Sequence, residues 1–465
     1  MRQALWPAAV LFAAVSAAAA PPPFTPTEMM KLQRVGDPQV SPDGSQVVYV
    51  ATSVSLGGNN QNADLWLVPT AGGEPRRLTN HPLGDNRPRW SPDGKRIGFL
   101  SRRSGTPQVF AVETNGDEPR KLTAVETGVS SFVWIDDEHL LVTSDVYPEC
   151  AERKPPAAAV VCNKEKADEA GKPSTARVYD HLLYRHWDTW EDGKRSHLLV
   201  VPTDGGDARD LTPGERDVPP FDVGGPDGFA VSPDGREVAF VRNDDPVEAI
   251  STNADIFVVP TAGGAAKKVA SGPGYDGAPR YSPDGSLLAY RSQPRAGYEA
   301  DRWRLMVYDR KGGGTRELTQ GFDLQVESFA WSPDSKTLYF TAAQDGRDPL
   351  FAVPAAGGAV KRLSEGTFSD LSVGGDGKLV VTTSVSLTHP PEVVRIASTG
   401  AAPTRLTNVN DAALHPFALR AGESVTYPGA AGKQVQAWIV RPPDFDPAKK
   451  YPLLVLIHGG PQGVW

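Results

Sequence analysis

The sequence predicts a mainly β protein, a seven-bladed β-propeller followed by the first strands of a second, α/β domain. The turn Ser-Pro-Asp-Gly recurs along the chain, and a hydrophobic hairpin follows each copy. The last residues are a short apolar run that leads into His458-Gly459-Gly460-Pro461. High contents of glycine (46) and proline (43) suit a protein with many tight turns.

The first twenty residues are typical of a secretory signal. Arg2 gives the positive start, Ala4–Val15 the apolar stretch and Ala18-Ala19-Ala20 the small-residue cleavage site. The alternative, a membrane anchor, needs a longer apolar run. We therefore expect a periplasmic or secreted protein that begins at residue 21.

Composition excludes several classes. A chain of 465 residues allows two or three domains, and its net charge of −8 gives no basic footprint for nucleic acid. The two cysteines, Cys150 and Cys162, lack metal-site spacing. In an exported chain we expect them to form a disulfide, whereas a reducing compartment would leave two thiols.

The repeated turn has a physical reason. Proline presets φ, aspartate bonds the local backbone, and glycine takes the left-handed conformation in which the chain doubles back. Four full copies, one near copy and two degenerate copies occur, at Ser41–Gly44, Ser91–Gly94, Ser232–Gly235, Ser282–Gly285, Ser332–Ser335, 134–137 and 374–377.

After each turn comes a strand-like run, and then a hairpin that ends in Leu-Thr or a similar pair, as in Leu65–Thr79. Seven turns alternate with seven hairpins, so each unit supplies about four strands over roughly 40–50 residues, the size of a propeller blade. One blade cannot bury both faces of its sheet, which favours a closed ring. A sandwich of generic hairpins is the alternative, and the fixed spacing argues against it.

One interval is about twice the usual step because residues 145–195 form an insertion in blade three. Its first half is a polar tract that contains both cysteines. Its second half, Tyr179–Asp192, reads YDHLLYRHWDTWED and concentrates aromatic, basic and acidic side chains.

The repeats occupy residues 21–407. Residues 408–421 look like a linker, and residues 422–465 look like the start of the second domain. Within them Val425–Tyr427 and Val435–Arg441 alternate as a hairpin, and the apolar run Leu453–Ile457 follows. A buried parallel strand followed by His-Gly-Gly-Pro is typical of an α/β-hydrolase, where this loop supplies an oxyanion-hole donor. In that fold the nucleophile comes later, on a G-x-S-x-G turn, and no such turn occurs in these residues.

Together these features resemble the prolyl oligopeptidase family of serine peptidases, in which a propeller precedes the hydrolase domain. The strand Ala437–Pro442 and YPLLVLIHGGPQG are similar to the acylaminoacyl-peptidase and dipeptidyl-peptidase branches. The insertion Tyr184–Leu198 is most similar to the dipeptidyl peptidase five branch.

The resemblance implies an oxyanion-hole role for the backbone N–H of Gly460. His458 would shape this loop or donate from its side chain, and a purely structural role is the alternative. The serine, aspartate and histidine of the triad cannot be assigned to any position here. We therefore expect the 465-residue chain by itself to be inactive.

The resemblance also implies that acids of a propeller insertion bind the substrate's ammonium group. The candidates are Asp188, Glu191 and Asp192, with Arg185 for a substrate carbonyl and Trp187 or Trp190 as a pocket wall. The alternative is that this segment packs the blade and its charges are solvated.

The sequence interpretation is an exported serine exopeptidase that releases dipeptides from short peptides. The alternatives are an acylaminoacyl peptidase and a non-enzymatic TolB-like binding propeller. No metal or cofactor motif is visible. We expect short peptides as partners, no nucleic acid, no membrane after signal cleavage, and a possible homo-oligomer through the hydrolase domain.

Overall fold

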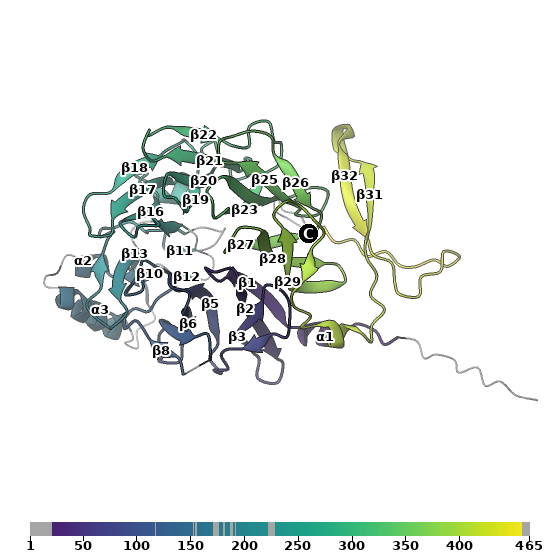
Figure 1. Ribbon diagram of the computed structural model, residues 1–465, viewed down its shortest axis with the longest axis horizontal. Helices are drawn as coiled ribbons and strands as arrows, with labels where there is room; N and C mark the ends of the chain where they lie inside the picture. The colour runs from purple at the N-terminus through teal and green to yellow at the C-terminus, as the bar shows by residue number, and fades with distance from the viewer. Residues whose placement is uncertain are drawn as a thin grey trace, which may run out of the picture.

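Seven four-stranded antiparallel sheets follow one another along the chain and form a ring (Figure 1). The computed structural model describes residues 21–116, 118–151, 153, 156–170, 176–179, 182–186, 189–190, 192–221 and 228–457. The predicted seven-bladed β-propeller is confirmed. Among the described helices, none is long and apolar enough to cross a bilayer.

Each blade is one sheet whose strands run outward from the centre of the ring in chain order. Blades one to three are β1 (Arg34–Val40), β2 (Gln46–Ser55), β3 (Asn60–Pro69) and β4 (Arg76–Arg77); β5 (Asp85–Trp90), β6 (Arg96–Ser101), β7 (Gln108–Glu113) and β8 (Arg120–Lys121); and β9 (Ser131–Trp134), β10 (His139–Val146), β13 (Arg195–Pro202) and β14 (Arg209–Asp210).

Blades four and five are β15 (Phe229–Val231), β16 (Glu237–Arg242), β17 (Asp255–Pro260) and β18 (Lys267–Ala270); and β19 (Asp276–Tyr281), β20 (Leu287–Ser292), β21 (Arg304–Asp309) and β22 (Thr315–Glu317). Blades six and seven are β23 (Val326–Trp331), β24 (Thr337–Ala342), β25 (Leu350–Pro354) and β26 (Lys361–Ser364); and β27 (Phe368–Val373), β28 (Leu379–Ser386), β29 (His389–Ala397) and β30 (Thr404–Arg405).

Short helices lie outside the sheets. They are α1 (Pro26–Met30), α2 (Pro148–Ala151), α3 (Pro156–Ala170), α4 (Asp411–Leu414) and the 3₁₀ turns η1 (Glu248–Ile250) and η2 (Ala430–Gly432). Helices α2 and α3 belong to the segment between β10 and β13, which is the insertion in blade three.

The repeated turn joins the first and second strands of a blade through the expected hydrogen bonds. The Ser91 hydroxyl donates to Asp93 Oδ1 at 2.7 Å and accepts from the Arg96 N–H at 3.0 Å. The bond from Ser91 holds the pKa of Asp93 below its ordinary value. Gly94 has a φ of +71°, which a residue with a Cβ rarely adopts.

The spacing that the hairpins repeat from blade to blade also has a structural reason. The first buried apolar residue of the third strand donates its N–H to the threonine hydroxyl fourteen residues later, as in Leu65 to Thr79 at 3.1 Å. Four other blades repeat this bond, at Val109–Thr123, Leu198–Thr212, Leu305–Thr319 and Val393–Thr407. The Leu-Thr signature therefore fixes the register of the short outer strand.

Blade seven closes on blade one without a shared strand, because each of these blades keeps four strands of its own. Tyr49 and Val68 of blade one share a buried cluster with Val381 and Val393 of blade seven. The Val40 N–H donates to Ser372 Oγ at 2.9 Å across the same junction.

Residues 408–421, expected as a linker, contribute to this closure. Asn410 is 1 % exposed; its amide oxygen accepts from the Gln33 N–H at 2.8 Å and its amide nitrogen donates to the Gln33 carbonyl at 3.0 Å. The two bonds join the chain after the last blade to the chain before the first.

We predict that Asn410→Ala lowers the free energy of unfolding by about 1–3 kcal/mol, because the N–H and the carbonyl of the half-buried Gln33 lose their partner. Urea unfolding followed by circular dichroism measures this. Asn408→Ala, at an exposed position two residues away, should change stability by less than about 0.5 kcal/mol. Equal effects of the two variants would contradict a specific role for Asn410.

After the ring, β31 (Glu423–Pro428) and β32 (Gln434–Ile439) form the predicted hairpin, which stands beside β26 in Figure 1. The predicted buried strand at Leu453–Ile457 is absent: these residues have no regular structure and their side chains are 64–91 % exposed. A parallel strand of this kind needs neighbouring strands and covering helices, and none packs on it among the described residues.

Candidate functional site

Most predicted site residues lie outside the described part of the chain. These are His458 and Gly460 of the oxyanion loop and Trp187, Asp188 and Glu191 of the insertion. Arg185 and Trp190 are described: they face each other across the two-stranded ladder of β11 (Arg185–His186) and β12 (Thr189–Trp190), and both are exposed.

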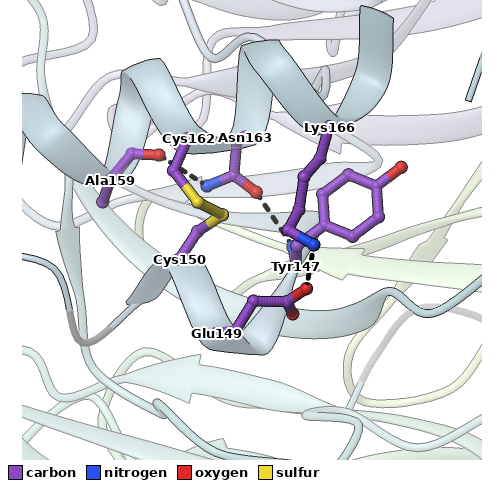
Figure 2. The surroundings of a disulfide bond; sticks show 7 residues. All are labelled: Tyr147, Glu149, Cys150, Ala159, Cys162, Asn163 and Lys166. Carbon is purple, nitrogen blue, oxygen red and sulfur yellow. Dashed lines mark hydrogen bonds and ion pairs between the residues drawn. A yellow bond between two sulfur atoms is a disulfide. The ribbon is translucent and has the colours of Figure 1, made fainter. Parts of the chain in front are cut away.

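Cys150 and Cys162 form a disulfide at the base of the insertion, with Cα atoms 5.6 Å apart (Figure 2). Both are buried. Beside them Asn163 Oδ1 accepts from the Tyr147 N–H at 2.9 Å, and Lys166 forms an ion pair with Glu149. The disulfide and these polar contacts fasten α3 to α2 where the chain leaves β10.

The double variant Cys150→Ala/Cys162→Ala should destabilise the insertion by about 3 kcal/mol, since the disulfide closes a loop between residues twelve positions apart. In the part of the chain that the structure describes, the buried apolar cluster of Cys150, Cys162 and Tyr147 includes no blade residue, so the main unfolding transition should stay within a few degrees. Limited trypsin digestion with mass spectrometry should show faster cleavage at Lys164 and Lys166. Reduced wild-type protein serves as the matched comparison, and cleavage confined to the blades would contradict this account.

Three aromatic rings gather in the second half of the insertion. Tyr179, Tyr184 and Trp190 have ring centroids 5.3–6.2 Å apart. Arg177 lies over the Trp190 ring at 4.7 Å and donates through Nε to Asp192 at 2.9 Å. Of the predicted residues, Trp190 therefore belongs to this group of three rings, which we call the aromatic wall. The Asp192 carboxylate already accepts a hydrogen bond from Arg177.

The insertion and the C-terminal hairpin lie on one face of the ring. In every blade the connection between the second and third strands lies on the face opposite the repeated turns, because the strands are antiparallel. The insertion is this connection in blade three. In blade six the same connection holds Arg347, whose guanidinium lies 5.5 Å from the centroid of the Trp438 ring of β32.

A cavity of about 1000 Å³ runs between the first strands of the blades. Asp37, Arg87, Ala278 and Asp370 line it and share a register position, at a β-bulge with φ between +48° and +57°. The sequence analysis did not predict that these residues line a cavity. A signal exists: each of these residues lies four positions before the first residue of the repeated turn.

His197 and Asp210 look like a catalytic pair but occupy a structural position. His197 is fully buried, with Nδ1 2.6 Å from Asp210 Oδ2 and Nε2 3.0 Å from the Gly214 carbonyl oxygen. Four other blades place an ion pair at the same spacing of thirteen residues, at Asp64–Arg77, Asp255–Lys268, Arg304–Glu317 and Glu392–Arg405. The pair therefore belongs to the repeat.

Burial alone would lower the pKa of His197, but the hydrogen bond and charge of Asp210 raise it. A raised folded-state pKa stabilises the fold below the ordinary value near 6.5, and this contribution is lost as the pH rises through the folded-state pKa.

We predict that His197→Gln lowers stability by about 2–3 kcal/mol at pH 5.5 and by less at pH 9. Urea unfolding at both pH values measures the difference. His415→Gln, at an exposed histidine, should give no such dependence. A loss for His197→Gln that grows with pH would contradict the assignment.

In the described ranges no group of three or more histidine, cysteine or acidic side chains could hold a metal ion.

The repeated blades identify the family of this chain. Residues 30–169 and 227–418 match the family described as TolB beta propeller domain. The chain belongs to this TolB propeller family.

This TolB-family chain is also related to S9 peptidases, as the sequence predicted. It is 30 % identical over 457 residues to dipeptidyl-peptidase 5 of Porphyromonas gingivalis, covering 94 % of this chain and 64 % of that protein. Dipeptidyl-peptidase 5 of Porphyromonas endodontalis is 30 % identical over 449 residues, which cover 94 % of this chain and 63 % of that protein. The chain thus spans less than two thirds of these relatives, and the match includes their propeller region.

Solved structures show the same fold. Pyrococcus horikoshii acylaminoacyl peptidase superposes with a TM-score of 0.68 at 16 % identity, covering 91 % of this chain and 60 % of that one. The beta-propeller domain of the Trilobed protease from Pyrococcus furiosus, described with an open velcro topology, superposes with a TM-score of 0.54 at 16 % identity. The match covers 82 % of this chain and 97 % of that one. Here too blades one and seven share no strand.

Proposed function

We propose that this chain supplies the propeller and substrate-recognition insertion of an exported serine exopeptidase that releases dipeptides from short peptides. The relation to dipeptidyl-peptidase 5 over 94 % of the chain supports the reaction class. One geometric observation carries the assignment: the insertion in blade three and the β31–β32 hairpin lie on the same face of the ring.

The chemistry follows from that placement. A hydrolase domain that continues from the hairpin would cover this face, and its serine would form an acyl-enzyme whose oxyanion the Gly460 N–H stabilises. Asp188 and Glu191 would bind the substrate ammonium group by charge-assisted hydrogen bonds, and Arg185 a peptide carbonyl. The aromatic wall of Tyr179, Tyr184 and Trp190 would border the substrate's side chains.

Native protein from the source cells provides the test. Peptide mapping by mass spectrometry should find residues beyond Trp465 that include a G-x-S-x-G peptide. That protein should cleave alanyl-alanyl 4-nitroanilide, with a free amine, at least tenfold faster in kcat/KM than its N-acetylated form. The reverse preference would favour an acylaminoacyl peptidase, and no cleavage of either would favour a binding propeller.

In the active protein, Asp188→Ala and Glu191→Ala should each lower kcat/KM for the free-amine substrate by about tenfold to a hundredfold, the loss of one charge-assisted bond. The N-acetylated substrate should be cleaved at an unchanged rate. Asp168→Ala, an exposed acid of α3, is the matched control. Unchanged kcat/KM in both variants would remove these residues from the site.

A further inference from the structure

A recess of about 490 Å³ lies between blades two and three, on the face of the ring that carries the insertion. Leu83 and Asn86 line it beside the start of β5. Arg102, which follows β6, and Asp145, near the end of β10, line it where the chain enters the insertion. The volume is within the range of small-ligand sites. The recess therefore lies at the foot of the insertion.

Arg102 and Asp145 occupy the same position in these neighbouring blades. Each follows a serine, Ser101 or Ser144, whose partner on the third strand directly precedes the residue bonded to the repeated threonine. The position carries a cation in blade two and an anion in blade three. Two opposite charges, one from each blade, therefore border the recess.

No bonded partner neutralises either charge in the part of the chain that the structure describes. Both side chains are exposed, and neither forms a hydrogen bond or an ion pair there. The charges of Lys194 and His197 act on Asp145 without bonding to it. His197 is held in its pair with Asp210, and Lys194 Nζ lies 5.6 Å from the centroid of the Tyr147 ring. Burial outweighs these charges and raises the pKa of Asp145, so a cationic ligand would stabilise its charged form.

An amide and several apolar side chains complete the recess. The Asn86 side chain is exposed and has no hydrogen-bond partner among the described residues. Its amide both donates and accepts, as pairing with a peptide bond requires. Leu83 is 59 % exposed, whereas Leu100 and Val129 form buried walls. The recess thus offers one group for each polar part of a short peptide.

We propose that this recess binds free dipeptides, with the carboxylate at Arg102, the ammonium group at Asp145 and the peptide bond at Asn86. An extended dipeptide spans about 7 Å. Blades packed about 10 Å apart carry the two charged groups, so a ligand of this length reaches both. Both end contacts are charge-assisted hydrogen bonds. The site goes beyond the proposed peptidase activity, because binding here needs neither a nucleophile nor the insertion residues proposed to hold the substrate.

The test is calorimetric titration of the purified 465-residue chain with alanyl-alanine in four forms: free, N-acetylated, C-amidated and doubly capped. The free dipeptide should bind, and each cap should weaken binding by about tenfold, the effect of one charge-assisted bond. Tetra-alanine spans about 13 Å when extended. It should bind more weakly than the dipeptide, because its two ends do not reach both charges together.

Two variants separate the two ends. In Asp145→Asn, N-acetylation should no longer weaken binding while C-amidation still does; in Arg102→Gln the pattern should reverse, and Arg102→Lys should restore part of the carboxylate effect. Arg120→Gln and Glu138→Gln, at exposed positions of the same two blades, should bind like wild type. Circular dichroism establishes that each variant is folded.

Doubly capped alanyl-alanine or tetra-alanine that binds as tightly as the free dipeptide would overturn the proposal, as would a folded chain that binds none of them. Unchanged cap effects in both Asp145→Asn and Arg102→Gln would do the same, because the dipeptide would then bind elsewhere. Each of these results would leave the peptidase assignment intact, because that assignment is tested by cleavage in the native protein. Selective binding by this chain would likewise stand even if the native protein cleaved no peptide.

Discussion

The closure of the ring is the constraint on which the rest of this structure depends. A four-stranded blade has two apolar faces, and each face is buried only against a neighbouring blade. Blades one and seven have no shared strand to hold them, so buried side chains such as Tyr49 and Val393 and the paired bonds of Asn410 to Gln33 take that role. Losing this junction would expose an apolar face on two blades at once.

Closure also determines where function can lie. Because every blade alternates strand direction in the same way, all connections between second and third strands share one face, and all repeated turns share the other. The insertion of blade three can grow without disturbing the ring, since it replaces one connection. The hairpin β31–β32 meets the same face at Arg347, so the insertion and the hairpin lie on one side of the ring.

The repeat gives a reference for judging individual side chains. A buried histidine paired with an aspartate would normally attract attention as a catalytic dyad. Here His197 and Asp210 occupy the position held by Asp64 and Arg77 in blade one, so their geometry follows from the register of the blade.

The sequence by itself determined the blade count, the turns, the hairpin after the ring and the relation to S9 peptidases, because these follow from local turn chemistry and spacing. Only the tertiary structure decided that Asn410 closes the ring, that Leu453–Ile457 forms no strand here, and that Asp37, Arg87 and Asp370 face one cavity. Local patterns specify each blade, whereas these features depend on which distant residues the closed ring brings together.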